Sequence, residues 1–209
     1  MTNEPQPTVF VVDDDASIRR SLSYLLASAG YRMETYASAD EFLAREPYHG
    51  IGCIILDVRM PSLTGMELQE KLIELAYSTP IIFYTAYGEL DMGVQAMKKG
   101  AFDFLTKPCE DEKFLAAVGS AVEKSRIIRA LHDEAEEIRK RINLLTPREH
   151  DILRCVVLGM LNKQIAWKLG IAEATVKIHR GRIMEKLHAK SVADLVRLVE
   201  KAGIEPRQP

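Results

Sequence analysis

Short apolar runs alternate with helical patterns along the first 124 residues of the chain. Between the runs, hydrophobic residues such as Ile18, Leu22 and Leu25 recur every three or four positions, which is the spacing of an amphipathic helix. Strands that alternate with helices predict a parallel sheet covered on both faces, so we expect a doubly wound α/β domain. The five predicted strands are 9–12, 32–36, 53–56, 80–84 and 102–105.

The pattern changes after this domain, because residues 113–145 form one long helical stretch without proline. A heptad-like apolar stripe predicts a stiff linker helix, which packs either on a second chain or back on the first domain. Residues 145–209 predict several short helices and no strand. We therefore expect domains at 1–125 and 145–209, joined by a linker helix at 126–144. The stripe consists of Ile128, Leu131, Ala135, Ile138, Ile142 and Leu145.

Charge separates the two predicted domains. Residues 1–124 carry a net charge of −8, and residues 145–209 carry +5, so the basic C-terminal domain is a candidate for binding nucleic acid. The apolar runs are too short to cross a bilayer and the N-terminus has no signal-peptide pattern, so we expect a cytoplasmic protein without membrane contact. The scattered Cys53, Cys109 and Cys155 indicate reduced thiols.

Polar side chains follow four of the five predicted strands. Asp13 and Asp14 follow the first, Asp57 the third, Thr85 the fourth and Lys107 the fifth. Because the carboxyl ends of parallel strands meet at one edge of a sheet, these side chains should lie close together. Clustered carboxylates require a cation, and oxygen ligands favour Mg²⁺. An aspartate can also attack a phosphoryl group, whose oxygens a lysine and a hydroxyl would bind.

These residues resemble the signature of receiver domains over about 7–125. The resemblance implies a flavodoxin-like sheet with strand order 2-1-3-4-5. It also implies that a sensor histidine kinase phosphorylates Asp57, and that Lys107 and Thr85 bind the phosphoryl group. Phe104 would be the switching aromatic residue. Mg²⁺ would be held by Asp13, Asp14, Asp57 and the backbone carbonyl of Arg59. The matching residues are Asp13-Asp14, Asp57, Arg59-Met60-Pro61, Gly65, Thr85-Ala86 and Lys107-Pro108.

The basic domain contains a helix-turn-helix pattern. Residues 162–169 predict a short helix, Gly170 a turn, and residues 172–187 a second helix. On the second helix Val176, Ile183 and Leu187 share one face and should pack inward, whereas its basic residues lie outside that face. Trp167, on the first helix, is interpreted as a core residue, with stacking on DNA bases as the alternative.

Residues 144–204 resemble the LuxR-type (NarL/FixJ) output domain. The matching segments are Thr146-Pro147-Arg148-Glu149, residues 162–171 and Thr175-Val176-Lys177-x-His179. The resemblance implies that Lys177 and Ile178 reach base edges and that Arg180 and Arg182 contact phosphates. It also implies a dimerisation helix with Leu195, Leu198 and Val199 as its apolar face. Gly181 departs from relatives that place a basic residue there, which leaves the bases that are read open. With its long linker, the chain is most similar to the FixJ/StyR subgroup.

Together these features predict a phosphorylation-gated transcription factor that binds double-stranded promoter DNA as a homodimer, with RNA polymerase as a further candidate partner. One alternative is a Mg²⁺-dependent phosphohydrolase. Arg59 argues against it, because it stands where such enzymes place a second aspartate, two residues after Asp57. The other alternative is a constitutive DNA-binding protein with a vestigial receiver, and the complete acidic and lysine set argues against that.

Overall fold

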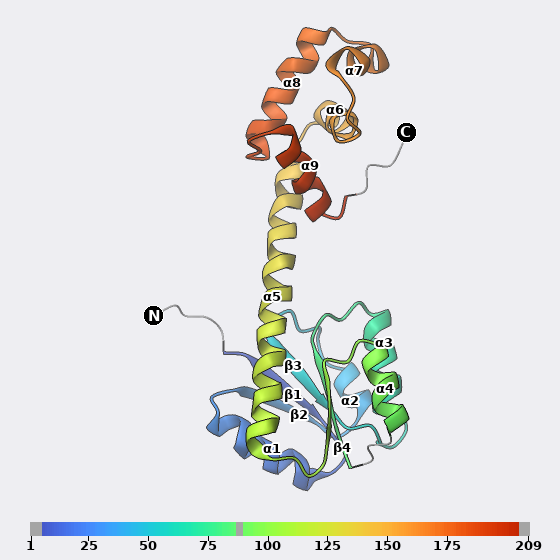
Figure 1. Cartoon of the computed structure of the whole chain (residues 1–209), viewed down its shortest axis with the longest axis vertical. Coiled ribbons are helices and arrows are strands. Elements are labelled where there is room, and N and C mark those ends of the chain that lie inside the picture. Colours follow the sequence, from blue (N-terminus) through green and yellow to red (C-terminus); the bar gives the residue numbers. More distant parts are fainter. Residues whose placement is uncertain (1–5, 87–89, 205–209) are drawn as a thin grey trace. The chain divides into compact units, whose positions relative to one another are not determined.

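The computed structural model describes residues 6–86 and 90–204 (Figure 1). The chain divides into two compact units, residues 1–129 and residues 130–209. We call them the receiver unit and the output unit and describe each by itself.

The receiver unit contains a five-stranded parallel sheet in the order β2-β1-β3-β4-β5. Strand β1 pairs with β2 on one side and with β3 on the other, so that Val12 lies between Tyr36 and Leu56. Both the doubly wound sheet and its strand order confirm the sequence prediction. The strands are β1 Thr8–Val12, β2 Arg32–Tyr36, β3 Gly52–Leu56, β4 Ile81–Thr85 and β5 Asp103–Thr106.

Helices cover both faces of this sheet, as Figure 1 shows. Because side chains alternate along a strand, Val9 and Val11 of β1 pack in the core formed with α1 and α5, whereas Phe10 and Val12 pack in the core formed with α2, α3 and α4. Burial on both faces explains why the strands read as continuous apolar runs. The helices are α1 Ala16–Ser28, α2 Ala39–Leu43, α3 Gly65–Glu74, α4 Leu90–Lys98 and α5 Asp111–Asn143.

Helix α3 begins against the loop that follows β3. The Thr64 hydroxyl accepts from the Glu67 backbone N–H, and the Glu67 carboxylate accepts from the Thr64 N–H, so the helix starts with a capping box. A Cβ atom at Gly65 would lie 2.1 Å from the carbonyl oxygen of Asp57. Only glycine therefore lets α3 pack this closely on the segment that carries Asp57.

The long helix α5 contributes to both hydrophobic cores. Near its N-terminus, Phe114 and Val118 are buried on the receiver sheet. Near its C-terminus, Ile138 and Ile142 are buried in the core of the output unit together with Leu145. These three residues belong to the predicted heptad stripe, so half of the stripe packs in the output unit itself. That outcome was neither of the two expected, because periodicity shows that a face is buried but not what covers it.

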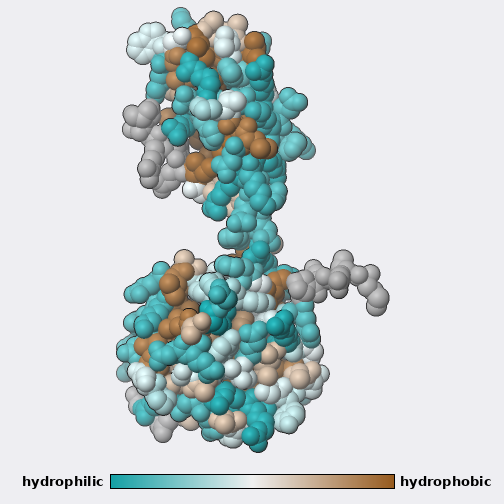
Figure 2. Space-filling model, turned by 180° about the vertical axis from the view of Figure 1, so that it is seen from behind, coloured by the Kyte–Doolittle hydropathy of each residue, from teal (hydrophilic) through white to brown (hydrophobic). Residues whose placement is uncertain are grey.

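The middle of α5 remains in solvent. Leu131, another member of the stripe, is 60% exposed, and residues 131–134, 136 and 137 are all exposed. Figure 2 shows mainly hydrophilic side chains over this part of the helix on the face turned to the viewer.

The output unit is helical in its described part. Around its core lie α6 Pro147–Val157, α7 Asn162–Leu169, α8 Glu173–Lys186 and α9 Val192–Lys201. Gly170 takes up a left-handed conformation (φ 63°) between α7 and α8. Val176, Ile183 and Leu187 are buried in this core, which confirms the predicted inward face of the second helix.

The three cysteines are free thiols. Cys53 lies in the receiver core, Cys155 lies in the output core, and Cys109 is half-buried. Burial raises the pKa of Cys53 to about 12. In the described residues, no helix is both long enough and apolar enough to span a membrane.

Candidate functional site

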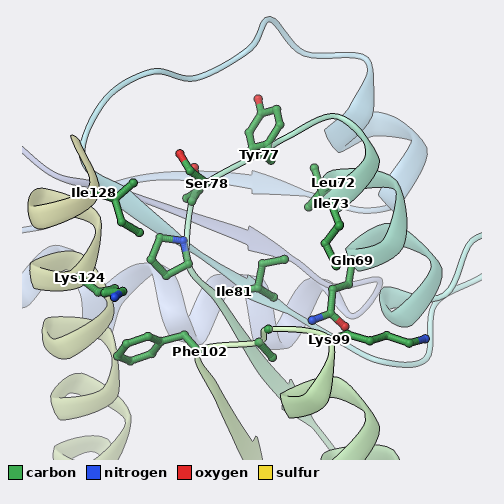
Figure 3. Close-up of a pocket in the computed structure, with 14 residues that line it drawn as sticks. Gln69, Leu72, Ile73, Tyr77, Ser78, Ile81, Lys99, Phe102, Lys124 and Ile128 are labelled. Atoms are coloured by element: carbon green, nitrogen blue, oxygen red, sulfur yellow. The ribbon is translucent and has the colours of Figure 1, made fainter. Parts of the chain in front are cut away.

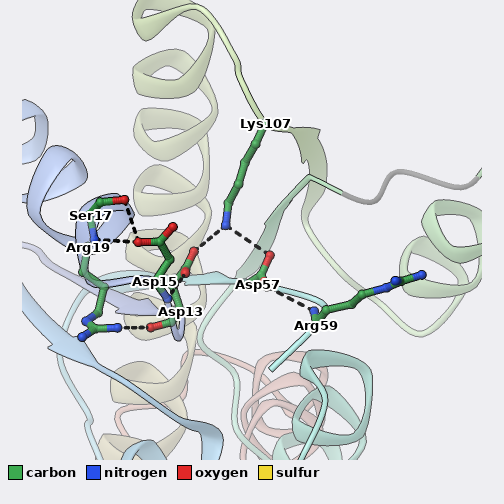
Figure 4. A network of polar contacts seen from close by, with 7 residues as sticks. All are labelled: Asp13, Asp15, Ser17, Arg19, Asp57, Arg59 and Lys107. Carbon is green, nitrogen blue, oxygen red and sulfur yellow. Dashed lines mark hydrogen bonds and ion pairs between the residues drawn. The ribbon is translucent and has the colours of Figure 1, made fainter. Parts of the chain in front are cut away.

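Three of the predicted site residues meet at the carboxyl edge of the sheet, as Figure 4 shows. The Lys107 Nζ donates to Asp13 Oδ2 at 2.5 Å and to Asp57 Oδ1 at 3.2 Å. Asp13 follows β1, Asp57 follows β3 and Lys107 follows β5, so the parallel topology brings together residues that are up to 94 positions apart in sequence. We call this group the acidic cleft.

Backbone contacts fix the two buried acids of the cleft. Asp13 Oδ1 accepts from the Asp15 N–H at 2.9 Å, and Asp57 Oδ2 accepts from the Arg59 N–H at 3.2 Å. The guanidinium of Arg19 donates to the Asp13 carbonyl oxygen at 2.5 Å, which ties α1 to the end of β1. Both carboxylates are thus held with one edge toward Lys107.

Burial sets the electrostatics of the acidic cleft. Asp13 is 3% exposed, and desolvation raises its pKa although Lys107 and the Asp15 N–H act in the opposite direction. For Lys107, burial alone would lower the pKa, but its contacts with Asp13 and Asp57 outweigh that effect and raise it. Lys107 therefore stays charged between two acids that water reaches poorly.

The cleft opens to solvent with a volume of about 600 Å³, and its lining includes Asp14, Arg59 and Tyr84 besides the three central residues. Asp14 is exposed at its rim. Thr85 is fully buried and Phe104 is half-buried, and neither lines the cleft. The Phe104 ring lies 5.9 Å from the Phe83 ring, on the side of the sheet that α4 covers. In the described residues, no three His, Cys, Asp or Glu side chains are grouped as a metal site.

A second cavity of about 310 Å³ lies elsewhere in the receiver unit (Figure 3). It involves the C-terminal part of α3, the segment before β4 and α5 residues Lys124 and Ile128. The buried Gln69 lines it and donates from Nε2 to the Ala96 carbonyl oxygen at 3.1 Å, which joins α3 to α4. None of the residues of the acidic cleft lines this cavity.

The output unit presents a basic surface along α8. Lys177, Ile178 and Arg182 are exposed, and Ile178 is 58% exposed despite its apolar side chain. Arg180 is half-buried, and its Nη1 donates to Asn162 Oδ1 at 2.6 Å, which joins α8 to the start of α7. A groove follows this junction and is lined by Leu161, Asn162, Lys163, Glu173, Lys177 and Arg180.

The three residues predicted for dimerisation lie on the side of α9 that packs in the output unit. Leu195 and Val199 are 2% and 3% exposed in the core of the output unit, and Leu198 is half-buried against the same core. Within this chain the apolar face of α9 packs in the output core, and the dimerisation role that the family resemblance implies stays a prediction.

Sequence reasoning also missed two features of the output unit. Trp167, expected in the core, is 88% exposed on α7. Glu149 is 2% exposed, and its Oε2 accepts from Lys186 Nζ at 2.7 Å and from the Thr146 N–H at 2.8 Å. The pattern Thr146-x-x-Glu149 indicates a capping box, but nothing in the sequence links it to Lys186.

Two protein families match the chain. The family described as "Response regulator receiver domain" matches residues 9–119, and the family described as "Bacterial regulatory proteins, luxR family" matches residues 143–199. The chain belongs to the LuxR-type response regulators.

Similar response regulators match almost the whole chain. Nodulation protein W of Bradyrhizobium diazoefficiens is 44% identical over 196 residues, which are 94% of this chain and 86% of that protein. The transcriptional regulatory protein TdiR of Thauera aromatica is 46% identical over 199 residues, with the same shares covered. The solved structure of response regulator StyR matches with a TM-score of 0.78 and 45% identity, covering 94% of this chain and 100% of that chain.

These matches confirm the predicted family and the predicted fold of both units. A LuxR-type response regulator is a transcription regulator that binds DNA in a phosphorylation-dependent manner, and this is the function of the chain.

Proposed function

We propose that Asp57 is the phosphorylated residue and that a sensor histidine kinase is the donor. The observation that supports this best is the Asp57 carboxylate itself, which is 7% exposed, lines the open cleft and lies 3.2 Å from the Lys107 ammonium. In the transfer, an Asp57 carboxylate oxygen attacks the phosphorus, and the bond between phosphorus and the donor histidine nitrogen breaks with its electron pair. Lys107 then neutralises a phosphoryl oxygen.

The residues of the acidic cleft fit Mg²⁺ in donor chemistry. The metal ligands that they offer are oxygen atoms, and the four carboxylates that line the cleft exceed its two cations, Lys107 and Arg59, in charge, which suits a hard divalent cation. Asp13, Asp14, Asp57 and the Arg59 backbone carbonyl would hold the ion. When bound, Mg²⁺ would supply positive charge to the acids and to the phosphoryl oxygens, in addition to the charge of Lys107.

Downstream of phosphorylation, Thr85 and Phe104 would transmit the change. Thr85 is buried beside the cleft and Phe104 is half-buried against α4, so a shift of both would alter the surface around β4 and β5. In the cytoplasm, the output unit would then bind promoter DNA as a homodimer, with Lys177 and Ile178 at base edges and Arg180 and Arg182 at phosphates. RNA polymerase is a further candidate partner.

Phosphorylation with acetyl phosphate and Mg²⁺ tests the assignment of Asp57. Intact mass of the wild type should increase by one phosphoryl group, and D57N should show no increase because an amide is a poor nucleophile. D40N is the matched control, because Asp40 is an exposed aspartate in the first turn of α2. Equal phosphorylation of D57N and the wild type would show that another residue accepts the group.

A further inference from the structure

Trp167 is the most exposed of the large hydrophobic residues in the described part of the chain, at 88%. Most exposed apolar residues need no explanation, but a tryptophan loses the largest apolar area on contact and is enriched where proteins bind partners. The residue stands on α7, the first helix of the helix-turn-helix. Its exposure therefore indicates a surface that another molecule covers.

The position of Trp167 relates it to the surface of α8. Lys163 lies in the groove with Lys177 and Arg180, so this side of α7 adjoins the side of α8 that carries the exposed cations. Trp167 is four residues after Lys163, which places the two side chains next to each other on one helix face. Ile165, on the opposite face of the helix, is buried in the core.

The surroundings of Trp167 are basic. Lys163 and Lys168 are both exposed on the same short helix, and the groove beside them adds Lys177 and Arg180. Such a surface attracts a polyanion. In helix-turn-helix proteins, the first helix crosses the DNA backbone while the second enters the major groove. Charge and location thus favour the sugar–phosphate backbone as the occupant.

We infer that Trp167 contacts the DNA backbone beside the groove that α8 enters. The indole Nε1–H is a donor without acceptor capacity, so it suits a phosphate oxygen, while the ring covers the adjacent deoxyribose. The contact adds to affinity for any sequence and carries no base information. This role rests on the DNA-binding function of the output unit. It adds Trp167 of α7 to the DNA contacts proposed for α8.

Binding of the full-length protein to a mixed-sequence DNA duplex tests this contact. Because Trp167 is the only tryptophan, its emission should change along the same binding curve as the anisotropy of labelled DNA. W167A should weaken binding by about tenfold, and W167F by less, since it loses the donor but keeps a ring. The slope of log K against log salt should stay unchanged in W167A, because no cation is removed, whereas K163A should flatten it by roughly one.

L144A serves as the control, because Leu144 is also a large exposed apolar residue, at 69%. It lies near the C-terminal end of α8, where Lys186 Nζ donates to the Leu144 carbonyl oxygen. It should bind DNA as the wild type does. If W167A binds within about twofold of the wild type and Trp167 emission ignores DNA, while K177A is weakened, the inference fails and DNA binding by the output unit stands. An emission change caused by RNA polymerase but not by DNA would also overturn it, since the occupant would be a protein.

Discussion

Each unit contains a lysine that contacts a buried carboxylate, but the two sites differ in their surroundings and in the pKa of the acid. In the receiver unit, Lys107 contacts Asp13 and Asp57 at an open cleft. In the output unit, Lys186 contacts Glu149, which is fixed in the capping box of α6. Burial raises the pKa of Asp13. Burial acts the same way on Glu149, but Lys186 and Thr146 outweigh it and lower its pKa to about 2.

The difference lies in how completely the charges are matched. Glu149 has one lysine and the Thr146 N–H for a single carboxylate, and the Lys186 ammonium also donates to the Leu144 carbonyl at 3.1 Å. In the acidic cleft, one lysine serves two buried acids, with Asp14 nearby. A fully matched pair stabilises its fold, whereas an excess of negative charge at an open cleft favours a cation and a phosphoryl group. The balance of charges, not the pair itself, separates structure from function.

The largest effect that we expect is on the stability of the isolated output unit, and it depends on whether the fragment includes the end of α5. A fragment of residues 130–209 should unfold cooperatively, because it contains Ile138 and Ile142, which are 1% and 2% exposed in its core. A fragment of residues 145–209 lacks both and should be largely unfolded, since losing each such side chain costs about 2–5 kcal/mol of a total of roughly 5–15.

Urea titrations followed by far-ultraviolet circular dichroism would measure both fragments. A third fragment, residues 130–209 with I138A, is the control for the core contact and should fall between the other two. Equal midpoints for all three would mean that α5 contributes nothing to the output core.

Removing one acid from each cluster contrasts the two sites directly. E149A should lower the free energy of unfolding of the output unit by about 2–4 kcal/mol, because it breaks the capping box and leaves Lys186 without its acid. D13A should change the receiver unit by less than about 1 kcal/mol, because Lys107 keeps Asp57 and repulsion between the acids is relieved. Urea titrations of a fragment of residues 1–129 and a fragment of residues 130–209, each followed by far-ultraviolet circular dichroism, would measure both. A larger loss of unfolding free energy in D13A than in E149A would contradict the distinction between a functional and a structural site.

The smallest effect that we expect is the change in stability of the output unit with pH, which reports on the protonation of Glu149. Its pKa is about 2 in the folded state and 4.5 ordinarily, so the carboxylate contributes stability that is fully present above pH 4.5. That stability is lost as the pH falls from 4.5 toward 2. E149Q should be less stable than the wild type at neutral pH and should show a flatter dependence below pH 4.5. Parallel profiles for E149Q and the wild type in urea titrations would contradict this role.

The receiver site could be predicted further from sequence than the output site could. Asp13, Asp57 and Lys107 each follow an apolar strand, and strand ends of a parallel sheet share one edge, so sequence order alone implies their proximity. In the output unit, periodicity indicates which helix faces are buried but not against what. Ile138 was therefore assigned to a partner outside its own unit, although it packs in the output core.

Single residues were harder to predict than patterns. Trp167 was assigned to the core because its size favours burial, yet Ile165 and Ala166 already occupy the inward face of this short helix. The contact between Glu149 and Lys186 joins α6 to α8 across 37 positions, and no local rule connects them.

The buried thiols have a practical consequence for measuring motion. Cys53 and Cys155 lie in separate hydrophobic cores, so a thiol reagent can reach each of them only when its own unit opens. With the half-buried Cys109 replaced by serine, the labelling rates of the two cysteines would report the opening of each unit within one intact chain. Phosphorylation that loosens or tightens only one unit would then change one rate and leave the other as an internal reference.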